Sequence, residues 1–118
     1  MKHKIILDCD PGHDDAIVIL LAARHPEIDL LAITTVAGNQ SLEKTTRNAL
    51  KVCSLASIRD VPIVIGMGRP FVRPAKHAAD IHGESGLDGP HIPEPTIELN
   101  RQHAVDLISD LLMDSEGI

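Results

Sequence analysis

Four aspartates gather within eight residues near the start of the chain: Asp8, Asp10, Asp14 and Asp15. They follow a short apolar run at residues 5–7 and precede a longer apolar segment. This pattern places them where a buried strand is predicted to turn into a buried helix. Carboxylates crowded into one loop repel one another, and a bound hard cation, a shared proton or free helix amides relieve that repulsion. The cluster therefore predicts metal or acid-base chemistry.

A purely structural role explains only part of this acidic cluster. Asp14 or Asp15 can act as a helix N-cap or a first-turn carboxylate, because the free amides and the helix dipole favour negative charge there. Asp8 and Asp10 lie two residues apart, so they point to the same side of an extended strand end. Since unpaired carboxylates are costly in a mostly buried setting, we expect a metal or substrate site.

Composition narrows the classes of protein that the sequence fits. With 118 residues, one domain with a core of ordinary size is expected. The 11 Lys and Arg residues against 17 Asp and Glu residues give a net charge of −6, which disfavours nucleic acid as a partner. The only aromatic residue is Phe71, so the stacking surfaces that bind single-stranded nucleic acid are missing as well.

The cysteines and the N-terminus indicate a cytoplasmic protein. Cys9 and Cys53 form no CxxC pair, which fits a reducing compartment, and both are expected to be buried as small apolar residues. Asp8 and Asp10 interrupt the first apolar stretch, so we expect neither a signal peptide nor a membrane-spanning segment.

Strands and helices are predicted to alternate along the chain. Residues 16–23 are apolar on every side and predict a helix covered by other elements. Strands are expected at 29–37 and 61–65, separated by a helix that Ser41 caps, and a last helix is expected after an Asn100 cap. This order predicts an α/β fold, a Rossmann-like parallel sheet with flanking helices.

Three loops follow the predicted strands and should therefore line one edge of the sheet. They are residues 10–15, Gly38 with Asn39, and residues 66–69. Asn39 can face the same ligand as the acidic loop, or it can serve as a plain turn residue. Gly66 and Gly68 are better explained by a turn than by a phosphate-binding loop, because no Gly-Lys-Ser/Thr follows them.

Residues 70–95 form a long stretch rich in Gly, Pro and His, without clear periodicity. Segments of this kind are often functional lids, so we interpret it as a flexible active-site flap. Of its histidines, His82 is the candidate for a functional role, because the flanking Gly83 and Gly86 would let the segment close over the edge of the sheet.

Residues 8–16 resemble the N-terminal signature of the inosine-uridine nucleoside hydrolases, in which two alternating aspartates, a Pro/Gly turn and two further aspartates follow one another. Residues 36–39 and 81–87 are similar to later segments of that family, and the likeness runs the whole length of the chain. It is strongest toward the bacterial pyrimidine-preferring ribonucleoside hydrolases. The resemblance implies hydrolysis of the N-glycosidic bond of ribonucleosides to ribose and free base by a water that Ca²⁺ activates, as part of nucleoside salvage.

The same resemblance implies a role for each candidate residue. Asp10 and Asp15 would bind Ca²⁺, and Asp10 would also act as the base toward the attacking water. Asp14 would hold the ribose hydroxyls and Asn39 would lie near the water. His82, in the flap over the nucleoside base, would contribute to substrate binding and catalysis. Asp8 would support the acidic loop from behind.

Members of the resembled family are more than twice as long and are commonly dimers or tetramers. Residues 1–118 are therefore expected to be the N-terminal part of a single nucleoside hydrolase domain, truncated and homo-oligomeric in its full-length form, with no nucleic acid or membrane as a partner. Two alternatives stay open. A Mg²⁺-dependent phosphatase resembling the haloacid dehalogenases would use Asp8 as nucleophile and Asp10 as acid/base. A non-catalytic fragment would bind ribose or a metal ion without turnover.

Overall fold

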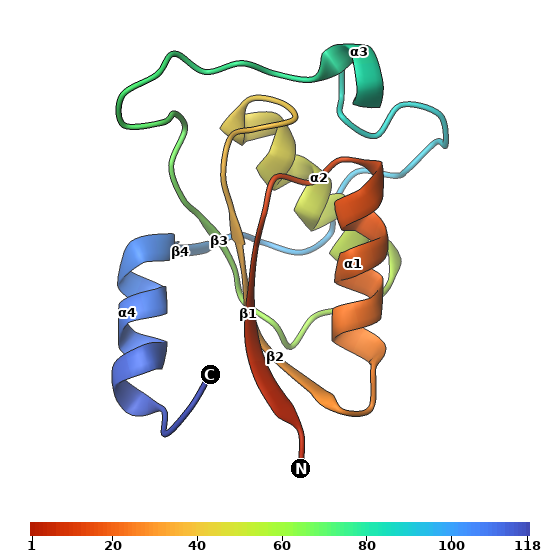
Figure 1. Ribbon diagram of the computed structural model, residues 1–118. Coiled ribbons are helices and arrows are strands. Elements are labelled where there is room, and N and C mark those ends of the chain that lie inside the picture. The colour runs from red at the N-terminus through yellow and green to blue at the C-terminus, as the bar shows by residue number, and fades with distance from the viewer.

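The computed structural model describes residues 1–118 as four strands and four helices (Figure 1). In chain order they are β1 His3–Cys9, α1 His13–Arg24, β2 Ile28–Thr35, α2 Leu42–Leu55, β3 Ile63–Ile65, α3 Ala79–His82, β4 Asn100–His103 and α4 Ala104–Asp114. The strands and helices predicted in the first 65 residues are all present, with bounds that differ by a few residues.

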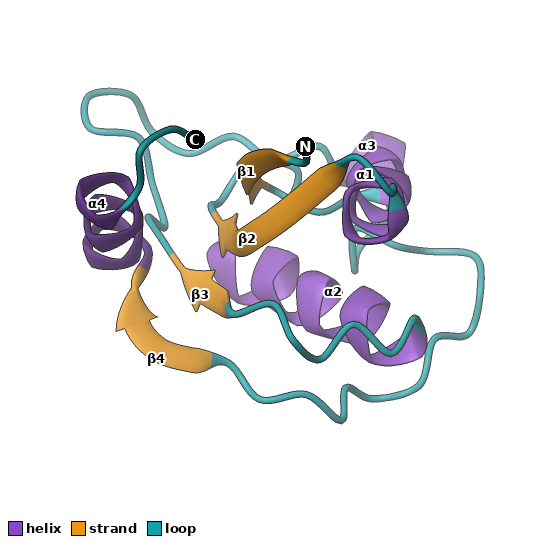
Figure 2. Ribbon diagram, turned by 90° about the horizontal axis from the view of Figure 1, so that it is seen from below, coloured by secondary structure: helices purple, strands orange, loops and turns teal.

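The four strands form one parallel sheet in the order β1-β2-β3-β4. Helices α1 and α2 lie on one face of this sheet and α4 lies on the other (Figures 1 and 2). The prediction of a parallel α/β sheet with flanking helices is confirmed. Because all four strands run in the same direction, the loops that follow β1, β2 and β3 meet at one edge, called here the carboxyl edge.

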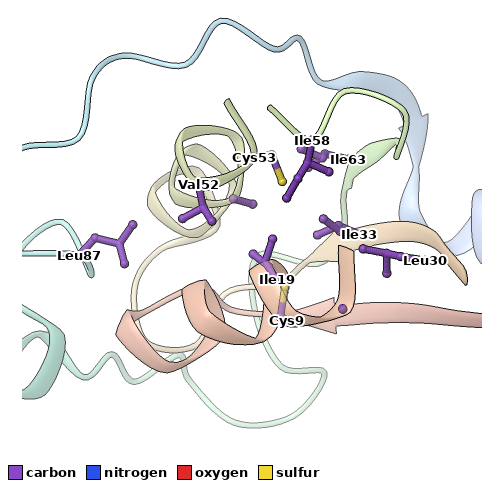
Figure 3. Packing of buried hydrophobic residues seen from close by; sticks show 11 residues of the cluster. Cys9, Ile19, Leu30, Ile33, Val52, Cys53, Ile58, Ile63 and Leu87 are labelled. Atoms are coloured by element: carbon purple, nitrogen blue, oxygen red, sulfur yellow. The ribbon is translucent and has the colours of Figure 1, made fainter. Parts of the chain in front are cut away.

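The core lies between the sheet and the helices α1 and α2 (Figure 3). It is an apolar cluster of 11 buried residues: Cys9, Ile19, Ala22, Leu30, Ile33, Ala49, Val52, Cys53, Ile58, Ile63 and Leu87. Leu87 belongs to the stretch 70–95, so part of that stretch packs against the core. Ser41 begins α2 as predicted, since its Oγ accepts a hydrogen bond from Lys44 N at 3.4 Å.

The expectation that α1 is covered on every side is wrong. Ile19 is fully buried and Ala22 is 5% exposed, whereas Ile17 is 65% exposed and Leu21 is 59% exposed. One side of the helix packs on the sheet and α2, and the other faces outward. A continuous apolar sequence does not distinguish a helix covered all round from one with an uncovered apolar face. None of the helices combines the length and the apolarity that a bilayer span requires.

The start of the last helix also differs from the prediction. Asn100 does not cap it; residues Asn100–His103 form β4, and the Asn100 side chain accepts from Gln102 N at 2.9 Å within that strand. The helix begins at Ala104, where His103 Nδ1 accepts from Val105 N at 3.2 Å. The sequence of β4 is polar and shows no alternation of apolar residues, so the local pattern does not predict a strand. Its pairing with β3 determines the strand conformation.

The two sides of α1 give a matched test of this packing. We expect Ile19→Ala to lower the free energy of unfolding by about 2–5 kcal/mol, because it leaves a cavity in the core. Ile17→Ala on the outward side should change it by no more than about 0.5 kcal/mol. Urea unfolding followed by circular dichroism measures both. A large loss for Ile17→Ala would show that the outward face is covered in solution.

Candidate active site at the carboxyl edge of the sheet

Asp10 is held by the loop that follows the neighbouring strand. Asn39 N donates to Asp10 Oδ2 at 2.7 Å, and Asn39 Nδ2 donates to the Asp10 carbonyl at 3.0 Å. A Cβ on Gly38 would lie 2.1 Å from Asp10 Oδ2, so only glycine leaves room for this carboxylate. The loops after β1 and β2 therefore lie together, as their strand order predicts, and Asn39 orients Asp10 rather than serving as a plain turn residue.

Asp15 lies beside Asp10 in the first turn of α1. Its Oδ2 accepts a hydrogen bond from Asp10 N at 3.1 Å. The helix begins after Gly12, which has no side-chain cap, so Asp14 and Asp15 are first-turn carboxylates and not N-caps. Burial, and then the charges of Asp14 and Asp10, raise the pKa of the Asp15 carboxyl above its ordinary value. Burial and neighbouring negative charge thus both disfavour the ionised form of Asp15.

Asp8 makes its hydrogen bond within the sheet. Thr34 Oγ1, on the neighbouring strand β2, donates to Asp8 Oδ1 at 2.5 Å, and Thr34 is fully buried. This contact ties the carboxylate to β2 and not to a side chain of the acidic loop. The support that Asp8 was expected to give the loop stays a prediction.

His82 reaches the acidic loop from the end of α3. Its Nδ1 accepts a hydrogen bond from His13 N at 3.3 Å, and the two imidazole ring centroids are 5.4 Å apart. A Cβ on Gly12 would lie 2.6 Å from His82 Nδ1, so glycine is needed for this approach as well. The sequence singled out His82 and the structure brings it to the carboxyl edge. It did not single out His13, whose Nε2 is 2.8 Å from the Asp88 carbonyl.

Cys9 lies behind the acidic loop as a neutral thiol. Burial, and then the neighbouring carboxylates Asp15, Asp8 and Asp10, raise its pKa to about 12. Burial raises the pKa of Cys53 to about 11. Both cysteines are free and buried, which confirms the expectation of small apolar residues.

The chain supplies part of a metal site. The Oδ2 atoms of Asp10 and Asp15 each accept a hydrogen bond from a backbone amide. Their Oδ1 atoms accept no hydrogen bond from the protein. Nowhere in the chain do three or more His, Cys, Asp or Glu side chains converge in an arrangement that could hold a metal ion. Two hard oxygen ligands are therefore available at this edge, fewer than the six to eight that Ca²⁺ takes.

A parallel sheet with polar loops gathered beyond its carboxyl ends defines a Rossmann-like α/β protein, a class in which ligands bind at that edge of the sheet. The family model described as inosine-uridine preferring nucleoside hydrolase matches residues 5–117, and the chain belongs to this family. The resemblance seen in the aspartate signature is confirmed, and family membership favours it over the phosphatase alternative. The family is metal-dependent and acts on ribonucleosides.

Similar proteins of known name are ribonucleoside hydrolases. The chain is 56% identical over 116 residues to the pyrimidine-specific ribonucleoside hydrolase RihB of Escherichia coli O1:K1, and equally so to the RihB of Escherichia fergusonii. These matches cover 98% of this chain and 37% of each relative. The chain therefore spans little more than a third of the length of these relatives.

Solved structures support the same assignment of fold. A purine-preferring ribonucleoside hydrolase from Gardnerella vaginalis superimposes with a TM-score of 0.86 at 32% identity, covering 94% of this chain and 36% of that one. The plant nucleoside hydrolase PpNRh1 gives a TM-score of 0.86 at 31% identity, covering 97% and 37%. The chain has the fold of the corresponding part of these enzymes.

The close approach of Gly38 to Asp10 can be tested by adding one methyl group. We expect Gly38→Ala to lower the free energy of unfolding by about 1–3 kcal/mol, because the methyl group must displace the Asp10 carboxylate. Gly68→Ala is the control, since its Cβ would meet only Leu42 atoms at 3.6 Å or more. Urea unfolding of both variants measures the difference, and equal stabilities would contradict the tight contact.

The raised pKa of Asp15 predicts a pH dependence of stability. The folded state holds the Asp15 proton more tightly than the unfolded chain does. Its contribution is therefore complete below the ordinary pKa of 3.8 and is lost as pH rises through the higher folded value. Asp15→Asn keeps an acceptor for Asp10 N but removes this loss.

We therefore expect the Asp15→Asn variant to gain stability relative to the wild type as pH rises toward neutrality in metal-free buffer. Urea unfolding at a series of pH values measures this gain. Asp106→Asn, which changes a first-turn carboxylate of α4, is the matched control. Parallel profiles for the wild type and Asp15→Asn would refute the raised pKa.

Proposed function

We propose that this chain carries the acidic loop of a ribonucleoside hydrolase, an enzyme that splits the N-glycosidic bond of a ribonucleoside into ribose and free base. The observation that carries the proposal is the fixed position of Asp10 at the carboxyl edge, where hydrogen bonds join it to Asn39 and Asp15. Membership of the nucleoside hydrolase family supports it. The residues of this edge can be assigned roles one by one.

Asp10 and Asp15 are the residues we propose as Ca²⁺ ligands. Their free Oδ1 atoms are hard oxygen donors, which Ca²⁺ prefers, and a cation beside them would offset both the burial and the neighbouring charges that raise the pKa of Asp15. When bound, a divalent cation supplies Lewis-acid activation of water. Ca²⁺ takes six to eight oxygen ligands, more than these two carboxylates supply.

Asp10 is also the proposed general base. The hydrogen bonds from Asn39 fix its orientation, and its carboxylate is proposed to take a proton from the attacking water. The water oxygen attacks C1′ of the ribose while the bond to the base breaks, through an oxocarbenium-like state, and the bonding electrons leave with the base. Asp8, bonded to Thr34 behind this loop, is proposed to support it.

Asp14 and His82 are proposed to contact the substrate. Asp14 is exposed in the first turn of α1, where its carboxylate is free to accept hydrogen bonds from ribose hydroxyls. His82 lies at the same edge beside His13, in a position to approach the nucleoside base and assist its departure. We propose Asn39, in the loop after β2, as a further residue that contacts the substrate. We propose residues 70–95 as the active-site flap that carries His82.

Three further properties are proposed from the relatives and the composition. The relatives at 56% identity are named as pyrimidine-specific, so pyrimidine ribonucleosides are the proposed substrates, used in nucleoside salvage. A cytoplasmic location fits two free, buried thiols. A homo-oligomer is the proposed state of the full-length form.

A second candidate, binding without turnover, is favoured by one observation: no complete set of metal ligands is assembled in this chain. In that case the acidic loop would bind Ca²⁺ and ribose, and hydrolysis would need further residues. Activity and metal binding must therefore be measured separately.

The decisive experiment measures ribose release from uridine and inosine by the 118-residue chain with Ca²⁺ present. We expect release to be faster from uridine, and Asp10→Ala to reduce it by about 10²–10⁴-fold, the usual contribution of a general base. Asp29→Ala, in β2 near the opposite end of the sheet, is the control.

Calorimetric titration with Ca²⁺ separates the two candidates. Binding that Asp10→Ala and Asp15→Asn weaken, without ribose release by the wild type, would favour the binding fragment. If the wild-type chain neither binds Ca²⁺ nor releases ribose, the proposal for this chain is overturned.

A further inference from the structure

The turn at residues 83–88, which follows His82 and is called here the flap turn, is held by a row of donors. Gln40 Nε2 donates to the Gly83 carbonyl at 2.9 Å. Lys44 Nζ donates to the Glu84 carbonyl at 2.5 Å, and Asn48 Nδ2 donates to the Ser85 carbonyl at 2.7 Å. Three side chains spaced four residues apart thus meet three consecutive carbonyls.

This spacing matches the geometry of a helix. Residues four apart lie one above the other on one face, and Lys44 and Asn48 belong to α2, which begins two residues after Gln40. We propose that Gln40, Lys44 and Asn48 are positioning residues that clamp the flap turn and thereby fix His82 at the acidic loop. The functional part of this proposal rests on the proposed function of His82.

The flap turn has a defined shape of its own. Every amide from residue 83 to residue 88 donates to an acceptor between residues 79 and 88. The Asp88 carboxylate accepts from Glu84 N at 3.0 Å and from Ser85 N at 3.1 Å. Because these amides are satisfied locally, the turn needs α2 for its placement and not for its internal hydrogen bonds.

Asn48 connects the flap turn to the acidic loop. It is 3% exposed, and its single NH₂ group donates both to the Ser85 carbonyl and to the Pro11 carbonyl at 3.1 Å. Gly86 has φ +87° and a Cβ there would lie 2.8 Å from Asn48 Nδ2, so glycine allows the turn to sit this close. One buried amide group therefore joins the acidic loop to the turn that follows His82.

The clamp acts on His82 through the backbone. Asp88 N donates to the His82 carbonyl at 3.3 Å, and the Asp88 carbonyl is 2.8 Å from His13 Nε2. The flap turn thus contacts both members of the histidine pair. Release of the turn from α2 should loosen the hydrogen bond from His13 N to His82 Nδ1 as well.

The test uses nuclear magnetic resonance of the full 118-residue chain. We expect Asn48→Ala to lower the backbone order parameters of residues 82–88 from about 0.85 to below about 0.6 and to abolish the cross-relaxation between the His13 and His82 rings. Lys44→Met should lower them by a smaller amount, and Lys44→Arg should restore them. The order parameters of α1 and β2 should stay unchanged in all variants.

Arg47→Met is the matched control, because Arg47 is one turn along α2 and pairs with Glu94, outside the flap turn. If Lys44→Met and Asn48→Ala both keep the order parameters and the ring contacts of the wild type, the proposal of a clamp is overturned. If Asn48→Ala does not fold, the half-buried Lys44 decides the outcome alone. Neither readout requires Ca²⁺ or turnover, so the clamp can fail while the hydrolase proposal holds, and the reverse.

Discussion

Repulsion among the aspartates at the carboxyl edge is the constraint on which the rest of the site depends. The fold answers it with backbone amides: Asn39 N binds the Asp10 carboxylate, and Asp10 N binds the Asp15 carboxylate. These bonds hold the carboxylates in place without removing their charge. Burial, and then the charges of Asp14 and Asp10, raise the pKa of the Asp15 carboxyl. Such a loop is suited to bind a cation or a polar ligand.

Close backbone approach is the second requirement, and the parallel sheet provides it. Adjacent strands bring the loops after β1 and β2 within hydrogen-bond distance, and glycines at 12 and 38 remove the side-chain atoms that would intervene. His82 and Asp10 each occupy space that a Cβ would fill. The positions of Asp10 and His82 therefore depend on strand pairing and on the absence of side chains at positions 12 and 38. Side chains of α2 also contribute to them.

Much of this arrangement could be predicted from the sequence because it follows from local pattern and parallel topology. The apolar runs located β1 and β2, and the rule that parallel strands end at one edge brought Asp10 and Asn39 together. The polar strand β4 could not be predicted, because its residues pair with β3 without any apolar alternation. The contacts of Asn48 could not be predicted either, because its carbonyl partners at Pro11 and Ser85 each lie 37 residues away in sequence.

The position of β1 at one end of the strand order has a consequence for the shape of the site. The sheet grows from β1 through β2, β3 and β4 in one direction only, so the other backbone edge of β1 has no neighbouring strand. In doubly wound sheets, ligands bind where the strand order reverses. A strand added to the free edge of β1 would create that reversal directly beside Asp10 and would bring a new set of loops to face the acidic one. The free edge of β1 is therefore the place in this sheet where an added strand would set new loops opposite the aspartates.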